Sequence, residues 1–141
     1  MKRTLFSIAL IACSLLLAGC NNQVQLSGQV TYSDNGSPLE TGLVIFESDK
    51  FYARGDIGAD GRYVLATHKA NDGLPPGEYR VYVADAMRNI TNPDGNSGYS
   101  VPLIAPKHTS PETSELVVEV NRSTKTFDFQ VDRAPGSRKS H

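Results

Sequence analysis

The feature of this sequence that most constrains its fold is a period-two alternation of apolar and polar residues. The alternation begins at Val24 and continues to Tyr32, with apolar or small residues at every second position. This period is that of a β-strand with one face in a core and one face in water. Further short apolar or alternating segments follow at residues 42–46, 51–57, 62–65, 78–84, 116–120 and 126–131. We therefore predict seven short strands.

The segments between these strands carry residues that favour tight turns. Asn35-Gly36 and Asp60-Gly61 can adopt the positive φ that such turns require. The sequence Leu74-Pro75-Pro76-Gly77 cannot belong to a helix or to a central strand. No segment after the N-terminal region has a 3.6-residue apolar period. The pattern predicts an all-β protein, a seven-stranded antiparallel β-sandwich that spans residues 24–132.

Two segments do not fit the strand pattern. Residues 85–115 are rich in Asn, Pro, Gly and Ser, and we expect a long irregular connection there. A loop of more than about 15 residues in a compact domain is usually functional or disordered, so residues 87–113 are a candidate binding loop. Residues 133–141 are polar, and we expect them to form a disordered tail.

The first 20 residues have the organisation of an export signal. Lys2 and Arg3 are followed by an uncharged run, residues 4–19, that is rich in Leu, Ile and Ala. This run is shorter than the roughly 20 residues of a membrane-spanning helix and suits the apolar part of a signal peptide. It ends in Leu17-Ala18-Gly19-Cys20, which resembles the lipobox of bacterial lipoproteins. The resemblance implies cleavage between Gly19 and Cys20, with diacylglycerol carried by the Cys20 thiol.

A lipid on Cys20 would determine where the protein is held. One acyl chain binds a membrane weakly, whereas two or three anchor durably. Asn21 follows the lipidated cysteine, and in the proteobacterial sorting rule a residue other than Asp there favours the outer membrane. We expect residues 1–19 to be removed and residues 20–23 to form a lipidated N-terminus and short tether. The expected location is the bacterial cell envelope, at the outer membrane, with the membrane as a partner through the lipid.

Composition narrows the classes of function. Charged residues make up 21% of the chain, and the two signs are interspersed. Removal of residues 1–19 takes away Lys2 and Arg3, so the formal net charge changes from −1 to −3. Without a basic run to follow phosphates, nucleic acid is not an expected partner. Cys13 lies inside the signal and Cys20 carries the lipid, so we expect no disulfide and no thiolate metal site.

Several short motifs, in order along the chain, resemble the carboxypeptidase regulatory-like, or transthyretin-like, domains. They are Ser27–Tyr32, Gly36–Leu39, Gly42–Phe46, Asp60–Tyr63 and Leu74–Val81. Residues 105–116 and 127–129 are similar to the small planctomycete-type lipoproteins of this family, so the resemblance covers residues 24–132. It implies a seven-stranded sandwich that acts as a structural or interaction module. Gly28 suits this architecture, since a glycine within a strand permits a kink or a close approach of another segment.

The sequence shows no spacing typical of a catalytic or metal site. His68, His108 and His141 are widely separated, whereas zinc needs three or four converging ligands. Residues 134–138 do not reproduce the Tyr-Arg-Gly-Ser ending of the hydroxyisourate hydrolases that share the transthyretin-like fold. The local Tyr and His pairs of intradiol dioxygenases are absent as well. We expect no enzyme activity and no cofactor.

The segment Asn92–Gly98 has part of the pattern of a calcium loop. It places oxygen ligands at the first positions of such a loop, but Ser97 stands where an EF-hand has Gly, and Leu103 stands where it has Glu. A turn of this composition needs no metal, so we expect no metal at this segment.

Exposed aromatic side chains are the remaining binding candidates. Tyr52, Tyr82 and Tyr99 fall outside the main apolar alternation or within loops, where they could equally cover sheet edges. Aromatic rings stack on sugars and are enriched at protein interfaces. We expect a non-catalytic module that serves a structural role or binds an envelope protein. The alternative is a carbohydrate-binding module that holds envelope or extracellular polysaccharide through these tyrosines and the 87–113 loop. A third reading is an enzyme with a metal site at His68 and His108.

Overall fold

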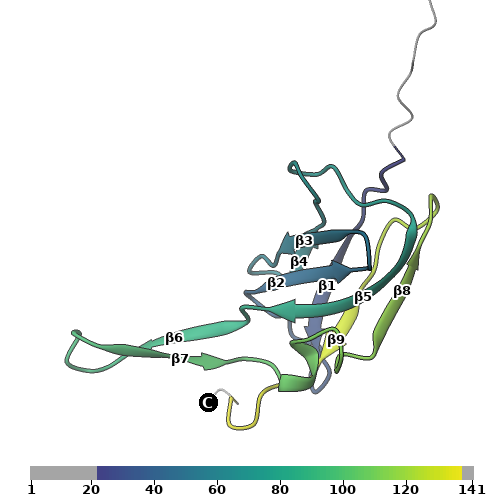
Figure 1. Ribbon diagram of the computed structural model, residues 1–141. Helices are drawn as coiled ribbons and strands as arrows, with labels where there is room; N and C mark the ends of the chain where they lie inside the picture. The colour runs from purple at the N-terminus through teal and green to yellow at the C-terminus, as the bar shows by residue number, and fades with distance from the viewer. Residues whose placement is uncertain (1–21, 138–141) are drawn as a thin grey trace, which may run out of the picture.

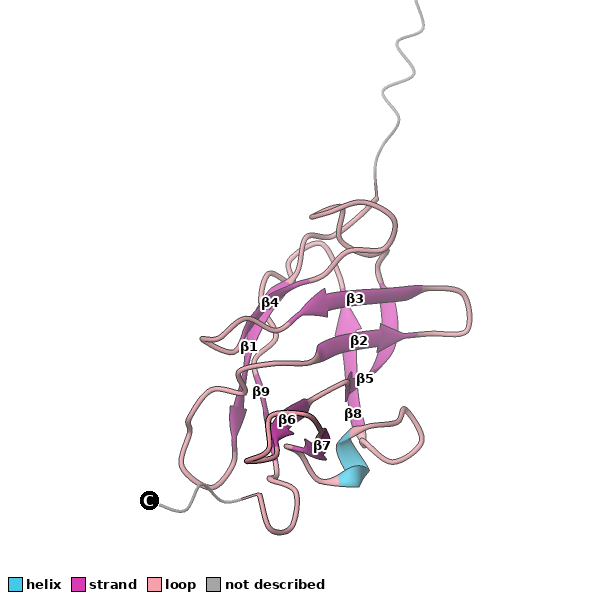
Figure 2. Ribbon diagram, turned by 90° about the vertical axis from the view of Figure 1, so that its left-hand side faces the viewer, coloured by secondary structure: helices cyan, strands magenta, loops and turns pink. Residues whose placement is uncertain are grey.

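The computed structural model describes residues 22–137, which form a two-layer β-sandwich with a hairpin projecting from one end (Figures 1 and 2). The larger sheet has the strand order β3-β2-β5-β8, the smaller sheet has the order β4-β1-β9, and β6 and β7 pair separately as the hairpin. A short 3-10 turn, η1, precedes β8. The bounds are β1 Ser27–Tyr32, β2 Leu43–Glu47, β3 Tyr52–Asp56, β4 Arg62–Val64, β5 Gly77–Ala84, β6 Met87–Thr91, β7 Gly98–Pro102, η1 Pro106–His108, β8 Leu116–Val120 and β9 Phe129–Val131.

The alternation in the sequence determines which face of each strand is buried. In β1 the residues Gly28, Val30 and Tyr32 are buried, while those between them are partly exposed. The same rule holds in β3 and β5. The inward side chains of the two sheets form one core, in which the ring of Phe46 lies 5.8 Å from the ring of Phe127. The prediction of an all-β sandwich is therefore confirmed.

Gly28 is the place where β1 is approached most closely by another segment. A β-carbon on Gly28 would overlap the carbonyl of Phe127 and would lie 2.7 Å from the hydroxyl of Tyr63. Tyr63 is opposite Gly28 in the register of β4 and β1, and its hydroxyl donates a hydrogen bond to the same Phe127 carbonyl. The missing side chain thus lets Tyr63 reach across β1, and the expected close approach is confirmed.

One strand pair departs from the predicted antiparallel sandwich. β1 and β9 run parallel, with Val30 opposite Phe129 and Tyr32 opposite Val131. β9 reaches β1 after the chain has crossed over from β8 in the other sheet, and such a crossing does not impose the antiparallel direction that a tight hairpin imposes. The larger sheet is antiparallel throughout. The antiparallel prediction is therefore correct for the larger sheet and wrong for the pair of β1 and β9.

The prediction of a long irregular connection over residues 85–115, which contains the candidate binding loop 87–113, is wrong for its first part. Residues 87–102 form the β6–β7 hairpin, with Ile90 opposite Tyr99, so residues 22–137 contain nine strands rather than seven. The segment rich in Asn, Pro and Gly is the turn of this hairpin, in which the N–H of Gly95 donates to the carbonyl of Asn92 over 2.9 Å. Most residues of the two strands are exposed, and the charged Arg88 interrupts the one face that carries Ile90, Tyr99 and Val101. The period-two signal that marks a half-buried strand is therefore weak in this segment.

Residues 133–137 are packed on the sandwich rather than forming part of a disordered tail. Arg133 forms a bridge with Ile104, and the side chains of Ala134 and Ser137 are buried. These residues are held by backbone hydrogen bonds and by the side-chain contacts of Arg133. Because neither depends on apolar side chains, the polar composition of the segment does not indicate that it is packed. The predicted boundary at residue 132 is too early. Residues 138–141 lie outside the described part of the chain.

Candidate functional site

A cavity of about 840 Å³ lies at the base of the hairpin, and we call it the hairpin-base cavity. Its walls come from four segments, namely the end of β1 with the connection to β2, the start of β6, Leu103 after β7, and the chain that follows β9. The volume falls in the range of small-ligand pockets, about 300–1,000 Å³. The lining residues are Tyr32, Asp34, Asn35, Ser37, Pro38, Glu40, Thr41, Met87, Arg88, Asn89, Leu103, Arg133 and Ser137.

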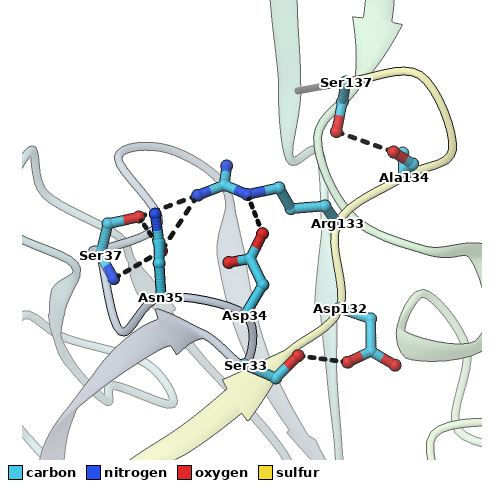
Figure 3. Close-up of polar contacts among 8 residues, drawn as sticks. All are labelled: Ser33, Asp34, Asn35, Ser37, Asp132, Arg133, Ala134 and Ser137. Carbon is cyan, nitrogen blue, oxygen red and sulfur yellow. Dashed lines mark hydrogen bonds and ion pairs between the residues drawn. The ribbon is translucent and has the colours of Figure 1, made fainter. Parts of the chain in front are cut away.

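Arg133 organises one wall of this cavity. Its Nε donates to the carboxylate of Asp34 over 2.8 Å, and its Nη2 donates to the hydroxyl of Ser37 over 2.9 Å (Figure 3). Its guanidinium carbon lies 3.6 Å from the centroid of the Tyr32 ring. The side chain of Arg133 is only 18% exposed. The guanidinium of Arg133 is thus paired with groups of the protein itself, and these contacts hold the wall in place.

The turn that receives Arg133 is ordered by its own side chains. The carboxamide oxygen of Asn35 accepts hydrogen bonds from the N–H and the hydroxyl of Ser37, over 3.0 and 2.8 Å. Gly36 has a φ of 72°, the left-handed conformation that glycine adopts without strain. The turn predicted from Asn35-Gly36 therefore exists, and it positions the acceptors of the Arg133 guanidinium.

Ser33, His108 and Asp132 lie together at the ends of β1 and β9, but not in the order of a hydrolase triad. Ser33 donates its hydroxyl hydrogen to the carboxylate of Asp132, as Figure 3 shows, and not to a histidine. His108 Nε2 accepts a hydrogen bond from the backbone N–H of Asp132 over 2.9 Å. A nucleophilic serine needs a base within hydrogen-bond reach of its oxygen. These contacts instead join β1, η1 and β9.

The electrostatics of this cluster favour a charged Asp132 and a neutral His108. A hydrogen bond from Lys107, whose Nζ lies 2.5 Å from the carboxylate, and another from Ser33 lower the pKa of Asp132 to about 2. Burial lowers the pKa of His108, although the charge of Asp132 opposes this change. The Nδ1 atom of His108 is buried and has no hydrogen-bond partner among the described residues. The cluster is a structural junction with one titratable group held in its neutral form.

Arg88, at the start of β6, supplies the uncommitted positive charge of the cavity. Its side chain is half-buried and lines the cavity, and it makes no hydrogen bond or ion pair with any of residues 22–137. The lining also contains two acidic residues, of which Asp34 pairs with Arg133 and Glu40 has an interaction of its own. An anionic group that entered the cavity would therefore meet Arg88.

The sequence analysis does not identify Arg88 and Arg133 as site residues. For Arg133 the sequence contains one indication, because Arg133 continues the alternation of Phe127, Phe129 and Val131 and so places a charge at a core-facing position. Such a position requires a partner for the charge. Arg88 had no local signal, because its role depends on the folding of residues 87–102 into a hairpin.

The structure brings Tyr52 and Tyr82 to one face and leaves Tyr99 elsewhere. Tyr52 lies opposite Glu47 on the outer face of the larger sheet, and the Tyr82 hydroxyl donates to the Glu47 carboxylate over 2.8 Å. Burial and this bond to Glu47 raise the pKa of Tyr82. Tyr52 is 49% exposed, whereas Tyr82 is only partly exposed. Tyr99 is 56% exposed on β7 of the hairpin, so the three tyrosines do not form one row.

The remaining predicted site residues are distributed as follows. Gly19 and Cys20 lie outside residues 22–137, and within that range no helix is long and apolar enough to cross a membrane. His68 is exposed and lies apart from the His108 cluster. In the part of the chain that the structure describes, no group of three or more His, Cys, Asp or Glu residues could hold a metal ion.

Comparison with known proteins supports the fold of the chain but assigns it to no family. No protein-family model matches the chain, and no curated protein matches it. Among solved structures, a variant of BcpA, the major pilin subunit of Bacillus cereus, is similar with a TM-score of 0.51 and 11% identity. The match covers 81% of this chain and 30% of the pilin chain. A DUF3823 family protein from Bacteroides ovatus is similar with a TM-score of 0.42 and 15% identity, over 79% of this chain and 45% of its own. The similarity to the pilin supports the β-sandwich fold, and this chain spans less than half of either protein.

Proposed function

We propose that this protein is an envelope lipoprotein whose β-sandwich is a non-catalytic, transthyretin-like module for structural or protein-protein interaction. The observation that carries the proposal is the position of the β6–β7 hairpin. It projects from the sandwich, away from the end where the described chain begins (Figure 1). The first three residues of its strand β6 line the hairpin-base cavity.

The two ends of the sandwich suit different tasks. Near the N-terminal end, Val24 forms a bridge with Leu74, and Arg122 donates a hydrogen bond to Asn22 over 3.1 Å. Cys20 is only two residues before Asn22. A lipid on Cys20 would hold this end near the membrane surface and direct the hairpin away from it. Asn21 supports a location at the outer membrane.

The hairpin has the exposure expected of a binding element rather than of a structural one. An isolated two-stranded hairpin is at best marginally stable in water, so a protein gains little stability from extending one into solvent. Met87 and Tyr99 are 42% and 56% exposed on it. Aromatic residues and Met are enriched at protein interfaces. The two side chains lie on opposite faces of the hairpin, because Tyr99 shares a face with Ile90, so a partner on either face would bury one of them.

The arrangement of polar residues supports a role without catalysis. The hydroxyl of Ser33 and the ring nitrogen Nε2 of His108 are both engaged with Asp132. Arg133 is engaged with Tyr32, Asp34 and Ser37. These groups fix the fold and are not poised for attack on a substrate.

The proposal is tested by site-specific photo-cross-linking in living cells with the full-length lipoprotein. A photoreactive residue at position 99 replaces the exposed Tyr99, and a control variant carries it at Arg122, near the tether. We expect reproducible cross-links to one or two envelope proteins from position 99, lost when residues 87–102 are shortened to a tight turn. The absence of cross-links from position 99, or equal capture from both positions, would overturn the proposal.

The alternative, a carbohydrate-binding module, is favoured by the outer face of the larger sheet. Tyr52 and Tyr82 flank Glu47 there, and a second cavity of about 720 Å³ starts at Glu47 and includes Phe51, which is 44% exposed. Since the chain has no Trp, its fluorescence comes from tyrosine. Titration with soluble peptidoglycan fragments or extracellular polysaccharide should quench that fluorescence in a carbohydrate binder. Tyr52→Ala should abolish the response, whereas Tyr99→Ala should not.

A further inference from the structure

We propose that the free edge of β6, next to Arg88, binds an extended acidic segment of a partner protein as an added strand. This inference rests on the proposed function as a protein-interaction module and specifies where and how the partner is bound. It follows from the backbone pattern of the hairpin, from the position of the hairpin-base cavity and from the unpaired charge of Arg88.

The backbone pattern shows which groups of β6 point outward. In an antiparallel pair, successive residues alternate between hydrogen-bonded and non-hydrogen-bonded pairs. Leu103 N–H bonds to the carbonyl of Ala86, and Asn92 N–H bonds to the carbonyl of Ser97. The even-numbered residues of β6 therefore face β7. The backbone groups of Asn89 and Thr91 face the free edge, together with the carbonyl of Met87, whose N–H is bonded to the carbonyl of Asp85 over 2.9 Å.

The two edges of the hairpin are not equivalent. On β7 the outward positions are Gly98, Ser100 and Pro102, the partners of the outward residues of β6. Pro102 has no N–H to donate, and proline on an edge strand blocks the addition of a further strand. β6 has no proline between residues 87 and 91. The edge of β6 is thus the one that can accept a strand.

The hairpin-base cavity runs along this open edge. Three successive residues of β6, namely Met87, Arg88 and Asn89, line it. Side chains alternate between the faces of a strand, so lining by three consecutive residues means that the cavity follows the strand itself. The opposite wall is the turn of residues 34–37, held by Arg133. The space beside β6 is therefore bounded by an ordered wall.

Arg88 indicates the chemistry of the occupant. Arg88 is partly buried and makes no hydrogen bond or ion pair with residues 22–137, and a partly buried cation without a partner is unfavourable. A guanidinium binds a carboxylate through two parallel hydrogen bonds. The outward N–H and C=O groups of β6 match the backbone of an extended peptide, as in the recognition of peptides by strand addition. Together they favour an extended segment that carries Asp or Glu.

The experiment uses full-length lipoprotein in detergent and a phage-displayed library of random peptides about seven residues long, since a strand has about five or six residues. We expect the enriched peptides to share an acidic residue within an extended, proline-free core. Fluorescence polarisation of one enriched peptide should show binding that weakens by about tenfold or more when its acidic residue is changed to Lys or when Arg88 is changed to Gln.

The matched pair of variants is Asn89→Pro and Ser100→Pro. These residues are opposite each other in a pair whose backbone groups both face outward, so neither proline removes a hydrogen bond between β6 and β7. Each variant also loses the same side-chain bond, from the Ser100 hydroxyl to the Asn89 carboxamide, 2.6 Å long. Asn89→Pro should abolish peptide binding, and Ser100→Pro should leave it within about twofold, because only β6 accepts the strand.

Other outcomes overturn the inference. They are a failure to enrich any peptide, enrichment of peptides without a carboxylate, equal effects of the two prolines, and self-association of the lipoprotein through the same edge. If cross-linking from position 99 still captures an envelope protein in the Asn89→Pro variant, the proposed function stands while the mode of binding at β6 is wrong. If cross-linking from position 99 captures nothing in the unmodified chain, the proposed function itself is wrong.

Discussion

The guanidinium of Arg133 lies against the ring of Tyr32, with its central carbon 3.6 Å from the ring centroid. Tyr32 is the last residue of β1, and Arg133 follows β9, the parallel neighbour of β1. The contact closes the end of the smaller sheet, and the ion pair with Asp34 extends it to the turn that lines the hairpin-base cavity. One cation thus joins the end of the sandwich core to the wall of the candidate site.

Arg133→Ala should lower the free energy of unfolding by about 1–3 kcal/mol, since it removes a cation–π contact and hydrogen bonds to a carboxylate. Arg133→Lys keeps the charge but not the planar fork, and should lose a large part of the same free energy. Urea unfolding of the mature protein measures both. Arg62→Ala is the control, because the ion pair of Arg62 with Asp60 is exposed and 3.7 Å long, and its loss should change the free energy by less than about 0.5 kcal/mol. An equal effect of Arg62→Ala and Arg133→Ala would contradict this account.

Gly28→Ala should destabilise the protein by about 2 kcal/mol or more, because the new methyl group would overlap the Phe127 carbonyl in a packed region. Tyr63→Phe should cost about 1–2 kcal/mol, since it leaves the Phe127 carbonyl without its hydroxyl donor. The combined variant should lose less than the sum of the two, because both changes break the same contact. Thermal unfolding provides the readout.

Gly58→Ala serves as the control for Gly28→Ala. The nearest atom to a β-carbon at Gly58 is a side-chain oxygen of Asp60 at 3.2 Å, and that side chain can move. We expect a change of less than about 1 kcal/mol. A harmless Gly28→Ala would show that β1 is not approached as closely as the contact with Phe127 requires.

The sequence predicts those parts of the fold that a local pattern encodes. Val30 and Tyr32 are buried because the alternation places them on one face, and Gly28 was expected at a close approach for the same local reason. The direction of β9 relative to β1 was not predictable in this way, since it depends on the path of the chain between the sheets. The hairpin is not evident from the sequence, because most of its residues are exposed and Arg88 interrupts the face of Ile90, Tyr99 and Val101.

The candidate site was predicted only in part. The length of segment 87–113 predicts a binding element, and the residues of it that line the hairpin-base cavity are Met87, Arg88, Asn89 and Leu103. Tyr99 is exposed on the same hairpin and is free to contact a ligand. Tyr82 instead donates a hydrogen bond from its hydroxyl to the Glu47 carboxylate. The cavity itself joins residues from four segments between positions 32 and 137. Its formation is a property of tertiary packing, and no local spacing in the sequence expresses it.

Cys20→Ala should leave a precursor that keeps residues 1–19 and incorporates no labelled palmitate. The thiol of Cys20 is the attachment point that the lipobox resemblance implies, so its removal should prevent both acylation and cleavage. Cys13→Ala is the matched control, since Cys13 lies within the apolar run and should be processed normally. Mass spectrometry of membrane fractions distinguishes the two forms. Mature, acylated protein in the Cys20→Ala variant would contradict the lipoprotein assignment.

His108 should make the stability of the protein fall as the pH falls below about 6.5, the ordinary pKa of histidine. Burial lowers the pKa of His108 in the folded state, so between the two pKa values the unfolded chain binds a proton that the folded chain does not. The contribution is therefore fully present above about 6.5 and is lost as the pH falls toward the folded pKa. Asp132, Lys107 and Ser33 surround this junction, and the lowered pKa of Asp132, about 2, places its own effect at more acidic pH.

Urea midpoints measured between about pH 5 and 8 test the role of His108, because this interval brackets the ordinary histidine pKa. His108→Gln provides an acceptor for the Asp132 N–H without a titrating ring, and should flatten the pH profile even if it lowers stability at every pH. His68→Gln is the control, because His68 is exposed and its replacement should leave the slope unchanged. A slope that persists in His108→Gln and disappears in His68→Gln would place the titrating group elsewhere. A flat profile in His108→Gln together with an unchanged slope in His68→Gln, the result that we expect, would show that the junction of β1, η1 and β9 depends on a neutral His108.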